Sequence, residues 1–118
     1  MEFDHERLDV YWLSLDFLVL AEKLIGALPK GRSHLSDPLT RASLSIVLNI
    51  AEGAGKVSPA DKRRYYLSAR GSATECAALL DVYLRVKLAH EADHRSGKES
   101  LLRIVSMLIR LAKSLEAR

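Results

Sequence analysis

Residues 41–55 read Arg41-Ala-Ser-Leu-Ser-Ile-Val-Leu-Asn-Ile-Ala-Glu-Gly-Ala-Gly55, and this stretch decides the fold. Apolar residues in it and just before it recur at the spacing of a helix with one buried face: Leu39, Ala42, Ile46 and Ile50. Asp37-Pro38 supplies the residue types that begin helices. Gly53 and Gly55 supply the type that ends them, because glycine adopts a left-handed cap at little cost. We therefore expect a helix over about residues 38–53.

A polar line runs beside the apolar face of this helix. Its members are separated by steps of four, four and three residues and carry opposite charges at the two ends: Arg41, Ser45, Asn49 and Glu52. An unpaired buried polar group costs about 1–3 kcal/mol, so a polar line at the edge of a core needs partners. We therefore expect it to form an interhelical polar seam with one specific neighbouring helix.

The rest of the chain shows three more helical patterns. They cover about residues 6–28, 59–89 and 93–116, so that residues 1–118 form one all-α domain. The connection over residues 53–58 is short, which makes the helices on either side of it antiparallel neighbours. The pattern favours an antiparallel up-down four-helix bundle. The expected core of the third helix is Tyr65, Ala69, Ala73, Cys76, Leu80 and Tyr83, and that of the fourth is Leu101, Ile104, Val105, Leu108, Leu111, Ala112 and Leu115.

The first helix is apolar over much of its circumference. One face carries Leu8, Tyr11, Leu15, Leu18, Ile25 and Leu28, and a second set widens it: Trp12, Leu13, Phe17, Leu20, Ala21 and Leu24. Such a helix is buried on more than one side. Its second side would contact either another subunit or a thick core of the same chain, and we interpret it as a subunit contact.

The second and third helices should pair in one register. Folding them back about Gly55 sets Arg41 opposite Ser72 and Glu75, and Glu52 opposite Arg63 or Arg64. We predict an Arg41–Glu75 ion pair that specifies this register more than it stabilises the fold. The small residues Gly71-Ser72-Ala73 would let another backbone approach closely.

Charge is distributed unevenly along the chain. Residues 1–27 carry six acidic and two basic side chains, whereas residues 28–70 carry eight basic and three acidic ones. A basic segment attracts phosphate, although a solvated helical surface explains it equally simply. The candidate nucleic-acid-binding residues are Lys30, Arg32, Lys56, Lys62, Arg63, Arg64 and Arg70. Tyr65 and Tyr66 lie beside three of them and would either stack on bases or join the core.

Other features argue against several classes of protein. No segment approaches the ~18 consecutive apolar residues of a membrane helix, and the acidic N-terminus is unlike a secretory signal. A single cysteine, Cys76, fits a reducing cytoplasm and a place in the core. His90-Glu-Ala-Asp-His94 matches the H-E-x-x-H motif of zinc hydrolases, but it falls at a predicted turn and has no clear third ligand. We expect no catalytic residues, metal or cofactor, with a metal-dependent hydrolase as the remote alternative.

Several of these residues together resemble a known family. Arg41-Ala42-Ser43-Leu44-Ser45-Ile46, Asn49-Ile50-Ala51-Glu52-Gly53, Ser58 and Ala69-Arg70-Gly71-Ser72-Ala73-x-Glu75 look like the signature of the proteins encoded in 23S rRNA intervening sequences. The accessory protein of diversity-generating retroelements is similar. The resemblance covers about residues 8–115.

The resemblance implies an antiparallel four-helix bundle that assembles into a homopentameric barrel without enzymatic activity. For the retroelement member it implies a reverse transcriptase and nucleic acid, RNA or DNA, as partners through a basic surface. The motif residues Arg41, Ser45, Asn49, Glu52, Gly53, Gly71, Ser72 and Glu75 are assigned to helix packing and subunit contacts. A purely structural or protein-interaction module is the alternative.

Overall fold

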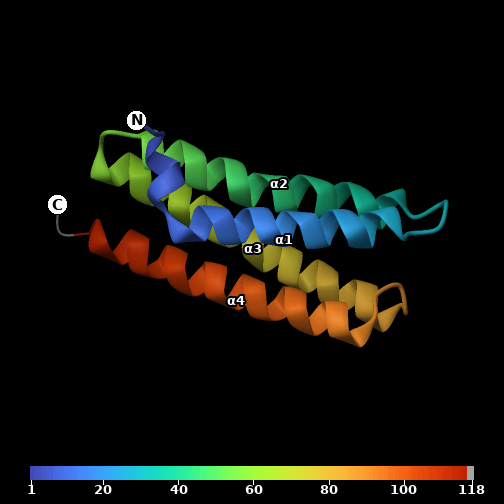
Figure 1. The fold of residues 1–118 in the computed structure, drawn as a ribbon. Coiled ribbons are helices and arrows are strands. Elements are labelled where there is room, and N and C mark those ends of the chain that lie inside the picture. Colours follow the sequence, from blue (N-terminus) through green and yellow to red (C-terminus); the bar gives the residue numbers. More distant parts are fainter. Residues whose placement is uncertain (117–118) are drawn as a thin grey trace.

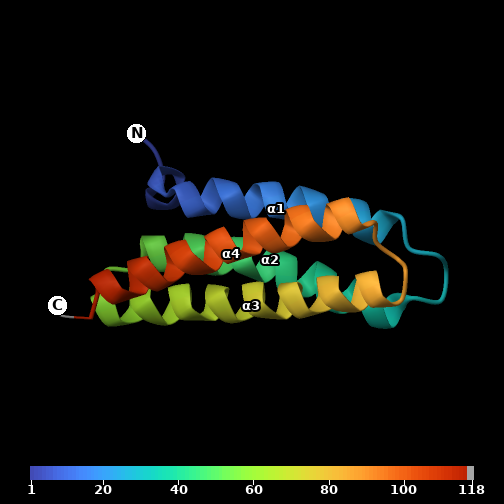
Figure 2. The same ribbon diagram turned by 90° about the horizontal axis from the view of Figure 1, so that it is seen from below.

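The computed structural model describes residues 1–116 of the chain. Four α-helices lie alongside one another in an up-down bundle that measures 47 × 24 × 22 Å (Figures 1 and 2). They are α1 (Asp9–Gly26), α2 (Ser33–Gly55), α3 (Pro59–Arg85) and α4 (Glu91–Ser114), and a short 3₁₀ helix, η1 (Asp4–Arg7), precedes them. Within the described residues there is no β-strand, as the predicted all-α bundle requires.

Helix α2 begins one turn earlier than predicted. It starts at Ser33, has Pro38 inside it, and receives no side-chain cap, so the Asp37 cap was a wrong prediction. Tertiary packing explains the extension, because the Leu35 side chain is buried and the Tyr83 hydroxyl of α3 donates a 2.9 Å hydrogen bond to the Leu35 carbonyl. Pro38 stands near the helix start, where its missing N–H removes a single helical bond.

The core follows the predicted stripes on α2, α3 and α4. Leu39, Ala42, Ile46 and Ile50 are fully buried. In α4 the predicted residues Leu101, Ile104, Leu108 and Ala112 are buried, whereas Val105, Leu111 and Leu115 are only partly buried against the core. In α3 the prediction of Tyr65 as a core residue was wrong. Tyr66 is buried in its place, whereas Tyr65 is half-buried beneath the side chains of Lys56 and Arg64.

Helix α1 is shorter and less buried than predicted. It occupies Asp9–Gly26 rather than residues 6–28, because η1 turns the chain back toward α2 before it begins. Its buried side chains are Val10, Ser14, Phe17, Ala21 and Leu24. The face that carries Leu8, Tyr11, Leu15, Leu18, Ile25 and Leu28 is only partly buried. Trp12 and Val19 are 51% and 71% exposed. Part of the apolar surface of α1 therefore stays exposed and does not pack against the core of its own chain.

The α3–α4 connection also differs from the prediction. Helix α3 ends at Arg85 rather than residue 89, because Lys87 adopts a φ of 64° and turns the chain. The Leu88 amide then donates to the Tyr83 carbonyl at 2.8 Å and the Lys87 amide to the Leu84 carbonyl at 3.0 Å, a Schellman motif. Helix α4 can consequently begin at Glu91, two residues before the predicted position.

Candidate functional site

The polar seam between α2 and α3 begins with an ion pair. Arg41 Nη2 lies 2.5 Å from Glu75 Oε2 and Arg41 Nη1 lies 3.5 Å from Glu75 Oε1, which confirms the predicted pair. The contact is bidentate, a geometry that guanidinium and carboxylate groups match well. Both side chains remain partly exposed, so the pair lies at the solvent-facing edge of the contact between α2 and α3. There it fixes the position of one helix along the other.

Hydroxyl and amide groups continue the seam toward the α2–α3 turn. Ser45 and Ser72 share a 2.9 Å hydrogen bond between their hydroxyl oxygens. The Asn49 side-chain amide donates to both the carbonyl and the hydroxyl oxygen of Ser45, each at 2.9 Å. Ser72 thus faces Ser45 rather than Arg41, because α2 and α3 are offset slightly from the predicted register.

The far end of the seam is built differently from the prediction. Glu52 pairs with Lys56 of its own helix at 3.6 Å, and not with Arg63 or Arg64. Arg63 instead reaches Glu116 beyond α4 at 3.3 Å, and Arg64 pairs with Asp61 at 3.4 Å. Arg64 thus finds its partner one turn away in its own helix, and Arg63 finds one beyond α4.

The two seam glycines have different roles. A Cβ at Gly53 would lie 2.9 Å from Tyr66 Cε1 and 3.0 Å from Tyr65 Cβ, so this glycine lets α3 approach α2. It does not end the helix, which continues to Gly55. A Cβ at Gly71 would meet no atom within 4 Å, so the predicted close backbone approach at Gly71 is absent from the described chain.

The candidate basic residues fall in three places rather than one. Lys30 and Arg32 belong to the α1–α2 connection, and Lys56 to Arg64 surround the α2–α3 turn at the opposite end of the bundle (Figure 1). Arg70 is exposed further along α3. Within the turn cluster, Lys62 Nζ donates to the Ala54 carbonyl at 2.7 Å and so caps α2. Lys56 and Arg64 instead contact the ring of Tyr65, with Lys56 Nζ 5.2 Å and Arg64 Cζ 4.9 Å from the ring centre.

The histidine motif is divided between a connection and a helix. His90 is the exposed residue before α4, and His94 in the first turn lies with Nε2 2.8 Å from Asp81 Oδ1 of α3. Lys98 donates to the same oxygen at 2.6 Å. Hydrogen bonds from Lys98 and then His94 hold the pKa of Asp81 below its usual value. In residues 1–116 no group of three His, Cys, Asp or Glu side chains could hold a metal ion.

Cys76 lies in the core and has no water-accessible surface. Burial, reinforced by the nearby Glu75 charge, raises the pKa of its thiol to about 12. A thiol in this state is a poor nucleophile, because the thiolate is the reactive form. The residue therefore fits the core position that the sequence predicts.

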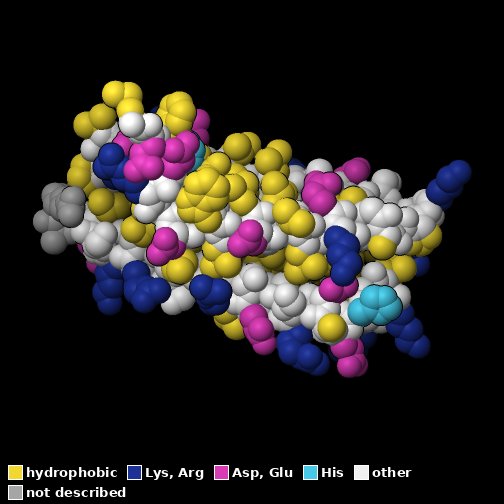
Figure 3. Space-filling model, viewed as in Figure 1, with side chains coloured by type: hydrophobic (Ala, Val, Ile, Leu, Met, Phe, Trp, Pro, Cys, Tyr) yellow, Lys and Arg dark blue, Asp and Glu magenta, His cyan; other side chains and the backbone are white. Residues whose placement is uncertain are grey.

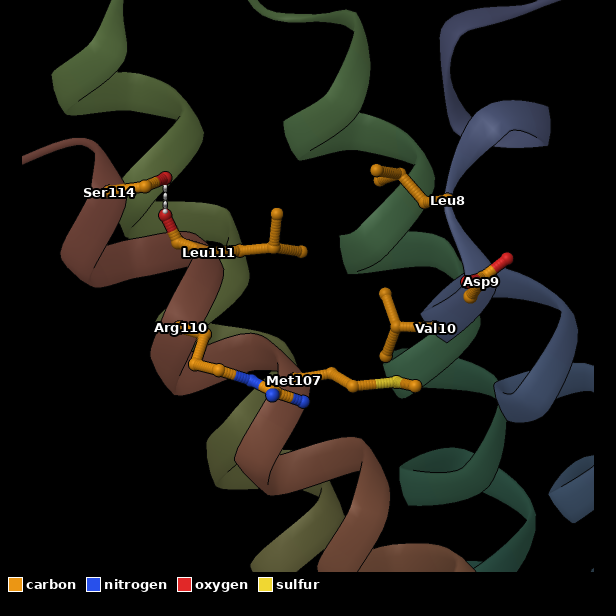
Figure 4. Close-up of a pocket in the computed structure, with 7 residues that line it drawn as sticks. All are labelled: Leu8, Asp9, Val10, Met107, Arg110, Leu111 and Ser114. Carbon is orange, nitrogen blue, oxygen red and sulfur yellow. Dashed lines mark hydrogen bonds between the residues drawn. The ribbon is translucent and has the colours of Figure 1, made fainter.

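A groove separates the start of α1 from the end of α4, and sequence reasoning missed it. It encloses about 340 Å³, and Figure 4 shows Leu8 and Val10 on one wall facing Met107 and Leu111 on the other. Asp9, Arg110 and Ser114 complete its lining. Figure 3 shows apolar and acidic side chains gathered over α1, and Lys and Arg side chains along the α4 edge.

The model of the 23S rRNA-intervening sequence protein family matches residues 6–110, which is most of the chain. The chain belongs to this family. Of the motif residues of this intervening-sequence protein, Arg41 and Glu75 form an ion pair between α2 and α3, and Ser45 and Ser72 share a hydrogen bond between them, whereas Asn49 and Glu52 bond within α2.

A solved structure is similar to this intervening-sequence protein over nearly its whole length. It is a protein of unknown function from the S23 ribosomal protein family of Bacteroides thetaiotaomicron VPI-5482, with 25% sequence identity and a TM-score of 0.81. The match covers 88% of this chain and 95% of the other. No match was found among the curated proteins with which the sequence was compared. Among residues 1–116 we find no helix with the length and apolarity that crossing a bilayer requires.

Proposed function

We propose that this intervening-sequence protein is a non-catalytic helical subunit that assembles with copies of itself, in the pentameric barrel that the family resemblance implies. The observation that carries the proposal is the outer face of the bundle. Trp12 and Val19 on α1, and Leu44 and Leu48 on α2, are each more than 40% exposed. Large apolar side chains grouped on adjacent helices favour an interface over a solvated surface.

The seam supports a structural role for the motif residues. Arg41 and Glu75 neutralise each other, and Ser45, Ser72 and Asn49 satisfy one another. A catalytic group needs an unsatisfied or strongly perturbed side chain in a cleft. Within the described residues, the seam contains no group of that kind, and the Cys76 thiol lies elsewhere in the core with its pKa raised.

Light scattering coupled to gel filtration tests self-association. Five copies of the 13.1 kDa chain would weigh about 66 kDa, whereas a monomer would keep the mass of one chain. The expected mass is a multiple of the chain that persists on dilution to low micromolar concentration. A monomer at every concentration would refute the proposal.

Nucleic-acid binding is a second candidate function, and one feature of the α2–α3 turn favours it. Lys56 and Arg64 flank the Tyr65 ring, which combines positive charge with an aromatic face at the end of the bundle. That combination suits single-stranded RNA or DNA, since phosphates and bases are both contacted. In a ring the turns of several copies would gather at one end, and their potentials would add. A reverse transcriptase carrying nucleic acid is the corresponding protein partner.

Fluorescence anisotropy with a labelled single-stranded RNA tests this candidate at low and moderate salt. Replacing Lys56 and Arg64 by alanine should weaken binding and lower the slope of log affinity against log salt by about 1.4, since each phosphate contact on a single strand contributes about 0.7. The matched control replaces Lys30 and Arg32, two cations at the opposite end of the bundle. Equal losses from both pairs would show that the α2–α3 turn is not the binding surface.

A further inference from the structure

Two rows of exposed side chains run along the outer faces of α1 and α4. The α1 row is Asp9, Trp12, Asp16 and Val19, and the α4 row is Leu102, Arg103, Ile109 and Arg110. Each row contains two large apolar residues seven positions apart and two like charges seven positions apart. Residues seven apart lie on the same side of a helix, so each row is a continuous stripe with an apolar edge and a charged edge. One row is acidic and the other is basic.

The acidic edge of the α1 row lies on the side of α4. Asp9 lines the α1–α4 groove, and Asp16 follows two turns later on the same side. Around the circumference of α1, Trp12 lies between Asp9 and Tyr11, so it is nearer to α2 than Asp9 is. The Tyr11 ring meets the His5 ring with 4.6 Å between the centres. His5 shares a hollow with residues of α2.

The basic edge of the α4 row lies on the side of α1. Arg110 lines the same groove as Asp9. Leu102 instead lines a hollow with Leu84, which belongs to α3. Going around the outside of the bundle from α2 to α3, the first two stripes belong to α1, an apolar edge followed by an acidic edge. The next two belong to α4, a basic edge followed by an apolar edge.

We propose that the α1 row of one copy packs against the α4 row of the next copy in the assembly proposed above, on which this inference rests. When two copies of the same orientation are placed side by side, the order of the stripes brings apolar edge to apolar edge and acidic edge to basic edge. The contact is heterologous, since two different surfaces meet, and repeated contacts of this kind form a ring when the rotation between neighbours closes, as the proposed barrel requires.

The heights of the two rows also match. Within one chain, α1 and α4 are antiparallel, with Lys23 bonded to Asp93 at 3.2 Å and Asp9 across the groove from Arg110. Asp16 is then level with Arg103. Copies related by rotation about an axis parallel to the helices are not shifted along it, so the same levels meet between neighbours. Asp9 would pair with Arg110, Asp16 with Arg103, and Trp12 and Val19 with Ile109 and Leu102.

The charged edges are available for this contact. Among residues 1–116, none of Asp9, Asp16, Arg103 and Arg110 has an ion-pair partner within its own chain. Asp9 stands at the edge of the groove, is exposed, and in Figure 4 its carboxylate points out of the groove, away from Arg110 of its own chain. Charges at the edge of an apolar interface select the partner and the register, as they do in coiled coils.

Charge reversal tests the pairing. One variant carries Asp9→Lys and Asp16→Lys, a second carries Arg103→Glu and Arg110→Glu, and a third carries all four changes. Each of the first two should raise the dissociation constant of the assembly at least tenfold, and the third should recover most of the loss. Light scattering gives the mass of the assembly. The fluorescence of Trp12, the sole tryptophan, reports whether this side chain is buried at the contact between copies.

The control variant carries Arg70→Glu and Arg85→Glu, which make the same charge change at exposed positions on α3. It should keep the mass of the unaltered chain. Circular dichroism shows whether each variant remains folded, and exposed substitutions are expected to leave the helices intact. An unaltered chain that is monomeric refutes the proposed assembly. An assembly that tolerates both double reversals, or whose loss the quadruple reversal does not recover, overturns this pairing while self-association stands.

Discussion

The Arg41–Glu75 pair offers a direct measurement of what the seam contributes. The Arg41 side chain is 65% exposed and the Glu75 side chain 40% exposed, so water screens both charges. Exposed pairs contribute about 0.2–1 kcal/mol, and the bidentate geometry places this one near the upper end. We therefore expect a coupling free energy of about 0.5–1 kcal/mol between the two side chains, despite their central place in the motif.

A double-mutant cycle measures this coupling. Urea unfolding of the unaltered chain, Arg41→Ala, Glu75→Ala and the double variant gives four free energies of unfolding, whose non-additivity is the pair's contribution. All four are compared at one protein concentration, since self-association changes apparent stability. Raising salt from about 0.05 to 0.5 M should reduce the coupling, because exposed charges are screened.

Two outcomes would contradict this reasoning. A coupling above about 2 kcal/mol, unaffected by salt, would mean that the pair is buried in the working state of the protein, for example by a subunit. A negligible coupling would mean that the pair contributes nothing even to register. The Arg64–Asp61 pair, 3.4 Å long and within one helix, serves as the matched control and should couple by about 0.3–0.5 kcal/mol.

Three further predictions follow from the core and the turns. Tyr83→Phe should lower the free energy of unfolding by about 0.5–1.5 kcal/mol in urea titrations, because it removes the buried hydrogen bond to Leu35; no loss would contradict that assignment. Lys87→Gly should raise it by about 0.5–1 kcal/mol, since glycine accepts the φ of 64° more easily, and a decrease would refute this account. The Cys76 thiol, whose pKa is raised to about 12, should resist a thiol reagent at pH 8 until urea unfolds the chain; rapid reaction of the folded protein would contradict its burial.

Local pattern was sufficient for the parts of this fold that repeat along one helix. The stripe of Leu39, Ala42, Ile46 and Ile50 is buried as its spacing predicts, because helical periodicity brings these residues to one face whatever they contact. The Arg41–Glu75 pair was also predictable. A short connection makes the helices on either side of it antiparallel, and the residue numbers then determine which positions meet.

Pairings near helix ends and between distant elements were not predictable in this way. Asp37-Pro38 has the composition of a helix start, yet the bond from Tyr83 to the Leu35 carbonyl carries α2 one turn further. Arg63 had a plausible partner in Glu52, but Glu116 lies closer in space. Several partners satisfy the same local chemistry at such positions, and long-range packing selects among them.

The candidate binding surfaces show the same difference between what local pattern predicts and what packing decides. The sequence by itself determined that α1 is apolar over much of its circumference, because composition and spacing alone establish this. Only the tertiary structure decided which part of that circumference stays exposed, with Trp12 and Val19 outward and Val10 inward. The seven basic residues were one segment in sequence, but helices about 20 residues long or longer carry chain neighbours to opposite ends of the bundle. Exposure and proximity depend on how the helices pack together, and periodicity within a single helix contains no information about that packing.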